Sequence, residues 1–444
     1  MSLVISKKRL KVLFTLAIPI IAGMLSQNLL NLVDTAMVGQ LSSTALAAVG
    51  LCTFLNFMAV GALMGFSSGV QAISARRIGE ERSNEAAKPL NFAIILIFFL
   101  SCIITSISYF LIPKILPFLN SDPKVVQSSI DYFSIRIFGV VFIGLNASFR
   151  GFFNAVGLER SYLKILVTMH FLNILFNYLL IFGKFGFPAL GVKGAAIGTV
   201  LSLSCGTVLY FYEATKKAKK YGFLERSFSF KEVKNLISIS LPRSVNQLFY
   251  GAGLSALFLI IGKVGTNEMA GANILMNIMM VATLPGIGFG FTSATLCSQA
   301  LGRGDKEDAY QWCIDIVKVS FTLISCLALL MILFPESILS IFTKDKEIIA
   351  VSLIPLRLTG LLVSLDVCGK VLMHSLLGVG DSKHVMFVST SLQWFFFLPL
   401  VYLIGPVLHY NLIGIWMLQG IYRSIQAAIF AKTWYNRKWV QIVI

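Results

Sequence analysis

The 444-residue sequence has few charged side chains and very few acidic ones. Only 13% of its residues are charged, against about a quarter in an ordinary soluble domain, and 20 acidic residues stand against 37 Lys and Arg. No GxxxxGK[ST] phosphate-binding loop occurs, which excludes a P-loop ATPase as the energy source. The four histidines and seven cysteines show no metal-ligand or CxxC spacing, so they indicate neither a metal centre nor disulfides.

Apolar residues are present in excess. They make up 57% of the sequence, and the mean hydropathy is +0.81. They form long runs separated by short polar stretches, and roughly 20 such residues cross a bilayer as a helix. We therefore predict an all-α polytopic membrane protein with about twelve transmembrane helices. The expected spans are 12–39, 44–74, 89–112, 125–149, 162–183, 191–213, 233–262, 267–300, 308–333, 347–377, 383–404 and 411–433.

The basic residues are distributed unevenly between the polar stretches. If the N-terminus is cytosolic, the cytosolic segments carry roughly 24 Lys and Arg and the opposite loops roughly 7. We therefore expect both termini in the cytosol of a bacterial-type inner (plasma) membrane, with basic loops that touch membrane lipid and bind no nucleic acid. The apolar run after Lys7 is too long for a cleavable signal peptide. The largest basic cluster contains Lys216, Lys217, Lys219, Lys220, Arg226, Lys231 and Lys234.

The second half of the sequence repeats the first at an offset of about 223 residues. We therefore predict two six-helix bundles, 1–215 and 233–444, joined by a basic cytoplasmic linker at 216–232. Because six helices return the chain to its starting side, the repeats are parallel, with a pseudo-two-fold axis along the membrane normal. Such pairs commonly hold a substrate cavity between the bundles and alternate its access. At this offset Pro19 matches Pro242, Gly39 matches Gly262, Asp122 matches Asp345 and Gly157 matches Gly380. After a two-residue slip, Gly65 matches Gly290 and Gly79 matches Gly304.

A polar stripe follows one face of the first span. Gln27, Asn31 and Asp34 recur at helical spacing, so they share a face that should not contact lipid. Hydrogen bonds between helices are a sufficient reason for the amide side chains of this stripe. An ionisable side chain at the centre of a membrane helix, however, costs about 2.5–3.5 kcal/mol of insertion free energy. No basic residue lies within a turn of Asp34 to offset this cost. We predict that Asp34 binds a proton or a cation, and that Gln27 and Asn31 line a substrate cavity.

Later spans carry further polar residues. Asn173 and Asn177 are one turn apart, and Thr199 lies in the next span. Hard cations such as Ca²⁺ and Mg²⁺ prefer oxygen ligands, and we extend this preference to Na⁺. The oxygens of these three residues and of Asp34 are therefore a candidate Na⁺ site. Interhelical hydrogen bonding alone is the alternative for these three. Asp366 and Lys370 are also one turn apart, which indicates an ion pair that is either structural or functional.

Methionine and phenylalanine are abundant, with 14 and 36 residues, as suits an adaptable apolar cavity. Met276 and Met280, which lie in the eighth span beside Met279, are the candidate lining residues of that kind.

Three motifs resemble those of the MATE (multidrug and toxic compound extrusion) family, and the resemblance covers nearly the whole chain. The first is Ile18-Pro19-Ile20 with Asn31-Leu32-Val33-Asp34-Thr35-Ala36-Met37-Val38-Gly39 and Ala45-Leu46-Ala47-Ala48-Val49-Gly50. The second is Leu241-Pro242 with Gly262 and Ala270-Gly271-Ala272. The third is Asp366 with Gly378-Val379-Gly380-Asp381-Ser382-Lys383.

The resemblance implies a secondary active transporter that exports organic cations and other xenobiotics in exchange for H⁺ or Na⁺. It implies that Asp34 is the family's first-helix acid, that Asn173, Asn177 and Thr199 occupy its N-lobe cation site, and that Asp366 is the C-lobe acid of the NorM-like branch. Tyr250 stands where that branch often has a glutamate, and Asn177 where the archaeal and DinF-like pattern has an aspartate.

Because each lobe lacks one of these acids, we favour the N-lobe around Asp34 as the coupling site and lean towards H⁺. The second candidate site comprises Asp366, Tyr250 and Lys370. We expect a monomer without a cofactor. A flippase for lipids or lipid-linked oligosaccharides is the alternative, suggested by Arg136, Arg357, Lys370 and Arg423 in predicted helices. An intramembrane enzyme is disfavoured, since it needs a convergent catalytic cluster.

Overall fold

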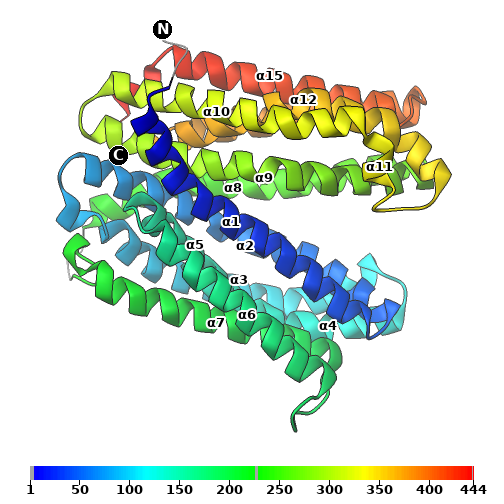
Figure 1. Cartoon of the computed structure of the whole chain (residues 1–444). Coiled ribbons are helices and arrows are strands. Elements are labelled where there is room, and N and C mark those ends of the chain that lie inside the picture. The colour runs from blue at the N-terminus through cyan, green and yellow to red at the C-terminus, as the bar shows by residue number, and fades with distance from the viewer. Residues whose placement is uncertain (1–4, 226–228, 443) are drawn as a thin grey trace. The chain divides into compact units, whose positions relative to one another are not determined.

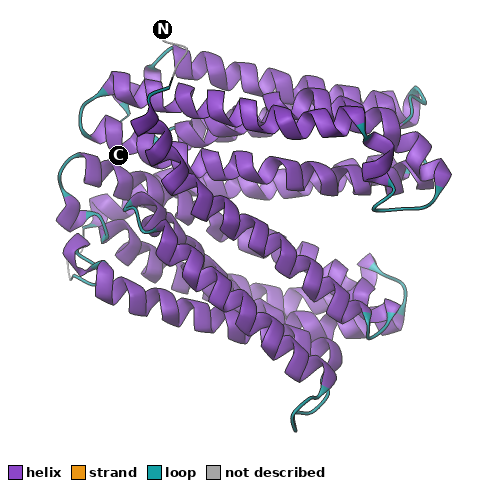
Figure 2. Cartoon of the chain, in the orientation of Figure 1, coloured by secondary structure: helices purple, strands orange, loops and turns teal. Residues whose placement is uncertain are grey.

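The computed structural model is helical along almost the whole chain (Figure 1, Figure 2), and the residues that it describes, 5–225, 229–442 and 444, include no β-strand. In these residues eleven helical segments are long and apolar enough to cross a membrane. A further helix, α15 (Leu412–Tyr435), contains 24 residues. The predicted all-α class with about twelve membrane helices is therefore confirmed.

The eleven segments begin and end close to the predicted limits. They are α1 (Lys7–Gly39), α2 (Ser43–Gly79), η1 (Ser83–Glu85) with α3 (Lys88–Leu119), α4 (Pro123–Arg136) with α5 (Val140–Ala155), α6 (Glu159–Phe182), α7 (Gly191–Lys217), α8 (Phe230–Gly262), α9 (Thr266–Gly302), α10 (Lys306–Leu333), α12 (Lys346–Gly378), and α13 (Ser382–Ser391) with α14 (Leu398–Tyr402). The short helix α11 (Pro335–Leu339) connects α10 to α12.

Two of the predicted spans are not regular helices. In the fourth, a 3₁₀ turn at Ile137–Gly139 joins α4 to α5. In the eleventh, π-helical stretches at Leu392–Phe397 and Leu403–Val407 flank α14. Pro406 lies in the second stretch and has no backbone N–H to donate. Apolar residues continue through both spans, so hydropathy alone predicts neither irregularity.

The helix ends reproduce the internal repeat. Helices α1 and α8 each contain 33 residues and α2 and α9 each contain 37, and the offset between the starts is the same in both pairs. The side chains of Asp122 and Asp345 each accept a hydrogen bond from the backbone N–H two residues further on, at 2.9 Å. Gly157 and Gly380 both adopt a positive φ, 79° and 96°, which glycine tolerates without strain. The predicted duplication is confirmed.

The helix ends also correct one part of the predicted alignment. The predicted two-residue slip pairs Gly65 with Gly290 and Gly79 with Gly304. Because α2 and α9 have equal lengths and keep the offset of α1 and α8, Gly65 corresponds to Gly288 and the last helical residue, Gly79, to Gly302. The slip is wrong, because the repeated Gly-Phe pairs of α9 offer two similar alignments when only the sequence is compared.

The chain forms two compact units, and the division falls within α1 and α8. Unit 2 is Ala22–Ser244, and unit 1 combines the chain up to Ile21 with Val245–Ile444. Both division points lie two residues after a proline inside the helix, Pro19 in α1 and Pro242 in α8. Proline removes a helical hydrogen bond and permits a bend. Each repeat therefore begins with a helix whose two parts belong to different units.

The predicted domain limits, 1–215 and 233–444, describe the repeats and remain a proposal for the folding domains. The described part of the segment assigned as a linker, 216–225 and 229–232, belongs to unit 2, and its beginning packs against the start of α3. The backbone N–H of Ala87 donates to Tyr221 O at 2.8 Å, and Asn91 Nδ2 donates to Gly222 O at 2.9 Å. Arg226, which belongs to the predicted basic cluster, lies outside the described residues.

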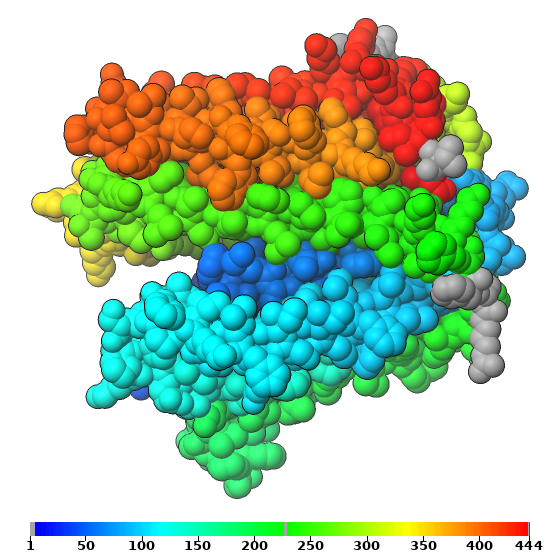
Figure 3. All heavy atoms as spheres, turned by 180° about the vertical axis from the view of Figure 1, so that it is seen from behind, coloured from blue at the N-terminus to red at the C-terminus, as the bar shows by residue number. Residues whose placement is uncertain are grey.

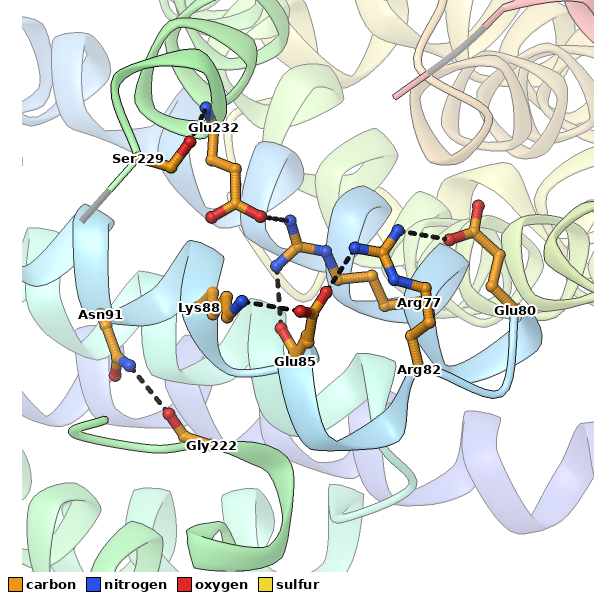
Figure 4. Close-up of polar contacts among 9 residues, drawn as sticks. All are labelled: Arg77, Glu80, Arg82, Glu85, Lys88, Asn91, Gly222, Ser229 and Glu232. Carbon is orange, nitrogen blue, oxygen red and sulfur yellow. Dashed lines mark hydrogen bonds and ion pairs between the residues drawn. The ribbon is translucent and has the colours of Figure 1, made fainter. Parts of the chain in front are cut away.

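A network of ion pairs joins α2, η1 and the start of α8 in unit 2 (Figure 4). Arg77 donates to Glu85 O at 2.8 Å and pairs with Glu232 at 2.5 Å, while Glu85 also binds Arg82 and Lys88. This network fixes the first turn of α8 against the end of α2.

An equivalent arrangement of opposite polarity occurs in unit 1. Arg9, the counterpart of Glu232 in the internal repeat, lies in the first turn of α1. It pairs with Asp308 and with Asp315 of α10, each at 2.8 Å, and its guanidinium lies 4.0 Å from the ring centre of Trp312. The first turn of the first helix in each repeat is thus held by charge pairs.

The outer face of α3 is apolar, as expected of a helix in contact with lipid. Side chains of α3 and α4 form much of the face of unit 2 that Figure 3 shows in light blue to cyan. Inside the same unit, Phe149 packs its ring 4.9 Å from that of Phe211 and 5.5 Å from that of Tyr210. Such aromatic pairs contribute about 0.5–1.5 kcal/mol each beyond simple burial. The exposed apolar residues of α3 include Ile95, Phe98, Phe99, Ile103, Ile107 and Phe110.

Candidate functional site

The only acid on the polar stripe of α1, Asp34, is half-buried and contacts α6 within unit 2. Asn177 Nδ2 donates a hydrogen bond to Asp34 Oδ1 at 2.9 Å. Asp34 forms no ion pair with any residue that the structure describes. Its charge is therefore stabilised by an amide and is not neutralised by direct contact with a cation.

The two asparagines of α6 form the buried wall of this site. Asn173 is 2% exposed and Asn177 is 1% exposed. Asn177 Nδ2 also donates to Asn173 Oδ1 at 3.2 Å, and Asn173 Nδ2 donates to Ser202 Oγ at 3.2 Å. Spacing alone predicts that Asn173 and Asn177 share a face, and the structure shows that this face meets Asp34.

One ligand atom in the wall has no protein partner. Asn177 Oδ1 is buried and makes no hydrogen bond. It lies against Gly198 of α7, where a Cβ atom would be only 2.3 Å away. A buried amide oxygen without a donor costs about 1–3 kcal/mol unless a water molecule or a bound species satisfies it. Together with the Asp34 carboxylate, this oxygen is chemically suited to a proton-carrying water or a hard cation.

Thr199 lies in α7 beside these residues, but its hydroxyl is engaged within its own helix. Thr199 Oγ1 donates to Ala195 O at 2.8 Å. Ser202, one turn further along α7, makes the contact to Asn173 and donates to Thr199 O at 2.8 Å. Sequence reasoning missed Ser202, although its i+3 spacing from Thr199 places it on the same face of the helix.

Arg136, the last residue of α4, is a cation of the same unit that influences Asp34. Its charge acts on the Asp34 carboxylate, although the two form no ion pair within 4 Å. Arg136 Nη1 is buried without a hydrogen-bond partner, beside Gly139 in the 3₁₀ turn. The irregular fourth span therefore places a guanidinium where it moderates the negative charge of Asp34 without pairing with it.

The polar stripe continues along α1 to a buried histidine. His170 is 5% exposed and lies between two α1 side chains, with Nδ1 at 2.7 Å from Ser26 Oγ and Nε2 at 3.1 Å from Gln27 Oε1. Gln27 Nε2 in turn donates to Asn31 Oδ1 at 3.3 Å. The predicted cavity residues Gln27 and Asn31 are exposed side chains of this stripe.

His170 is a further residue that sequence reasoning did not place in the site. It stands three and seven residues before Asn173 and Asn177, which puts all three on one face of α6. That spacing is visible in the sequence and was a usable signal.

The second candidate site gathers around Arg423 of α15 in unit 1. Asp366 of α12 pairs with Lys370 at 2.9 Å, as its spacing predicts, and its other oxygen lies 3.6 Å from Arg423 Nε. The Arg423 guanidinium is 5.9 Å from the ring centre of Tyr250 and 5.0 Å from that of Tyr422. The structure thus brings Asp366, Lys370 and Tyr250 together, and Arg423 joins them.

A pocket lies beside this cluster among α9, α12 and α15. Neither Met276 nor Met280 lines it. Met276 is partly buried and packs against the core of unit 1, and Met280 is 48% exposed. The pocket is lined by Met279, Leu358, Thr359, Leu362, Val363, Asp366, Trp416, Gln419, Gly420 and Arg423.

The chain is similar to known transporters along its whole length. The MatE family model matches twice, at residues 19–179 and 242–403, and the first match begins at Pro19 and the second at its repeat counterpart, Pro242. A "probable multidrug resistance protein NorM" of Thermotoga maritima is 26% identical over 92% of this chain and 88% of its own length. "Multidrug resistance protein MdtK" of Yersinia enterocolitica is 25% identical over 88% and 87%.

A solved structure shares the fold. It is described as the outward-facing conformation of a multidrug resistance MATE family transporter of the MOP superfamily. It superposes with a TM-score of 0.89 at 22% identity and covers 98% of this chain and 97% of its own. The double match of the family model, which covers most of the chain, confirms the predicted resemblance. This multi-pass membrane protein therefore belongs to the MatE family of transporters.

Proposed function

We propose that this chain is a secondary active multidrug exporter of the inner membrane. Organic cations and other xenobiotics leave the cytoplasm in exchange for H⁺ or Na⁺, and access alternates between the two sides of the membrane. Relatives that carry the name of multidrug resistance proteins over nearly their whole length support the substrate class. The observation that carries the coupling is an acid within a membrane-spanning helix, Asp34, with an amide partner and no paired cation among the described residues.

In this proposal Asp34 holds the exchanged ion, and the asparagines of α6 adjust its environment. Asn177 donates to the carboxylate and presents its unpartnered Oδ1, so it can stabilise the charged acid and also supply a ligand oxygen. Asn173 and Ser202 orient the Asn177 amide. Thr199 supplies a further oxygen if its hydroxyl turns away from Ala195. A small movement of α1 relative to α6 would break one hydrogen bond and release the ion.

Either ion is compatible with this set of oxygen atoms, and we favour H⁺ because only one acid is present. A proton needs a single carboxylate, whereas a tightly bound cation usually gains from a second. Among the described residues no group of three or more His, Cys, Asp and Glu side chains converges as a metal site would require. The ion is the transported species and not a resident cofactor, so we propose no cofactor.

The rival function, a flippase for lipids or lipid-linked oligosaccharides, needs several basic residues that converge to hold pyrophosphate. Arg357 is exposed on α12, and Lys370 and Arg423 share the single carboxylate of Asp366. Arg136 acts on Asp34 in the other unit. Within unit 1, Arg357 therefore does not join the two cations at Asp366, and the named relatives favour export of drugs. We expect no enzymatic activity, a monomeric protein, cytosolic termini and no binding of nucleic acid.

Transport by purified protein in proteoliposomes tests the proposal. A pH gradient and a Na⁺ gradient are imposed separately, and movement of a fluorescent organic cation is followed. We expect movement against the dye gradient with the pH gradient and none with protein-free liposomes. Movement that is equally fast without any ion gradient would contradict secondary antiport, and dependence on ATP would contradict it more strongly.

A further inference from the structure

The pocket of unit 1 has an imbalance of charge. Asp366 is the only acid that forms an ion pair with Lys370 or Arg423 among the residues that the structure describes. Two cations therefore share one carboxylate, and the cluster carries a net positive charge within membrane-spanning helices. Uncompensated charge is costly at that depth, and buried charges are normally matched by partners. A net cation is unexpected in a pocket whose ligand would itself be a cation.

The polar groups of the pocket are incompletely used by the protein. Arg423 Nη1 donates to Gln426 Oε1 at 3.1 Å, but Arg423 Nε makes no hydrogen bond and only approaches Asp366. Gln419, which is 6% exposed, makes one weak contact to Met279 Sδ at 3.6 Å, and its Oε1 has no partner. A guanidinium with donors in a planar fork is the side chain best shaped for a carboxylate.

The remaining lining suits an aromatic or aliphatic group. Met279, Leu362 and Trp416 are among the pocket residues, and Trp416 Nε1 is already bonded to Thr359 Oγ1 at 3.1 Å. The indole therefore presents its ring, because its polar atom is satisfied within the protein. One charged end and an apolar wall define an amphipathic ligand.

We propose that this pocket binds the carboxylate group of an amphipathic aromatic substrate through Arg423. Lys370 adds positive charge and Asp366 competes with the substrate for both cations. The proposal deepens the proposed function, because it adds acidic or zwitterionic compounds to the expected organic cations. It rests on the proposed function, because a bound acid is a substrate only if the protein is an exporter. The test measures binding alone, without any ion gradient.

Two probes of matched shape test the proposal on the purified full-length protein in lipid nanodiscs. They are 2-naphthoate, an anion, and 2-naphthylmethylamine, a cation. Titration calorimetry measures affinity, and quenching of tryptophan fluorescence supports it because Trp416 lines the pocket. We expect saturable binding of 2-naphthoate to the wild-type protein and at least about tenfold weaker binding of the amine.

Substitutions distinguish an anion site from a cation site, because they change the affinity for 2-naphthoate in opposite directions in the two cases. Arg423→Gln should weaken binding of 2-naphthoate about tenfold or more, and Arg423→Lys should restore part of it. Asp366→Asn should tighten binding, because the competing carboxylate is removed. Arg357→Gln is the matched control for Arg423→Gln, since it removes an exposed arginine from α12, the helix that carries Asp366, and should leave the affinity unchanged.

Three results would overturn the proposal. One is absence of saturable 2-naphthoate binding to monodisperse wild-type protein, and another is tighter binding of the amine than of the acid. The third is weakening by Asp366→Asn in protein that keeps the thermal stability of the wild type. Asp34→Asn should leave 2-naphthoate binding intact. A wrong assignment of this pocket would therefore appear as absent or reversed binding, whereas a wrong coupling proposal would appear only in transport measurements.

Discussion

At the scale of single residues, the space around Asn177 is the most restrictive feature of the candidate coupling site. Gly198 of α7 lies so close that a methyl group would stand 2.3 Å from Asn177 Oδ1. The amide must then move, and its hydrogen bond to Asp34 must lengthen or break. The glycine is therefore part of the site, although it has no side chain.

Gly198→Ala should reduce gradient-driven transport strongly and cost about 1–3 kcal/mol of stability through overpacking. Gly50→Ala is the control, because no atom lies within 4 Å of a Cβ at that exposed helical position. Transport in proteoliposomes and melting temperature are measured for both variants. Unchanged transport in Gly198→Ala would show that the position of Asn177 is unimportant for coupling.

The two acids of the candidate sites should respond differently to neutralisation. Asp366 is shared by Lys370 and Arg423, whereas Asp34 has no paired cation among the described residues. Asp366→Asn should therefore reduce resistance to cationic drugs less than Asp34→Asn in cells that lack their own exporters, at equal protein levels. Equal loss in the two variants would show that unit 1 also takes part in coupling.

At the scale of helices, each repeat begins with a first turn that is held by a charge pair. Glu232 of α8 binds Arg77, and its repeat counterpart in α1, Arg9, binds Asp308 and Asp315. The charge is reversed between the two repeats, with an acid in α8 and a base in α1, but the ion pair is at the equivalent position. The duplicated helices therefore keep an ion pair in the first turn and not the residue type. This indicates that fixing the start of α1 and α8 is itself needed.

Glu232→Gln should lower the free energy of unfolding by about 1–3 kcal/mol, because Arg77 is left buried with only a carbonyl partner. Lys193→Gln breaks an exposed pair with Asp131 and should cost no more than about 0.5 kcal/mol. Thermal unfolding in the same detergent compares the two variants. A smaller effect for Glu232→Gln than for Lys193→Gln would contradict an anchoring role.

Helix number, helix type and the repeat follow from the sequence, because hydropathy and a constant offset between the halves are one-dimensional patterns. The pairing of Asp366 with Lys370 also follows, since the two are one turn apart. Two other contacts do not follow from spacing. Arg423 of α15 meets Asp366 of α12, and Asn177 of α6 meets Asp34 of α1. Because the members of each pair lie on different helices, no sequence spacing relates them. Packing of one helix on another decides such contacts.

Contacts between helices also decide the features that the sequence does not predict. The 3₁₀ turn at Ile137–Gly139 has an apolar sequence that also suits a regular helix, and its effect appears only where Arg136 meets the rest of unit 2. The N-terminal part of α1 belongs to unit 1 because Leu13 and Ala17 pack in its core, and the sequence alone does not show which apolar residues they meet. The prolines, two residues before each division, were the visible signal.

At the scale of the whole molecule, we propose that one acid, Asp34, links an ion gradient to the movement of a substrate. Repeats related by duplication supply the architecture, but of the two candidate sites only the one in unit 2 has an acid without a paired cation among the described residues. Loss of that acid should therefore uncouple the protein and leave it folded. Substrate binding should persist, because the ion and the substrate are held by different groups.

Comparison of the wild type with Asp34→Asn in proteoliposomes tests this claim most directly. Dye accumulation driven by a pH gradient and exchange of labelled for unlabelled dye without a gradient are measured on the same preparations, with Asp131→Asn as the control. We predict that Asp34→Asn loses gradient-driven accumulation and still exchanges labelled for unlabelled dye, while Asp131→Asn resembles the wild type in both measurements. Gradient-driven accumulation at the wild-type rate in Asp34→Asn would show that Asp34 is not the coupling acid.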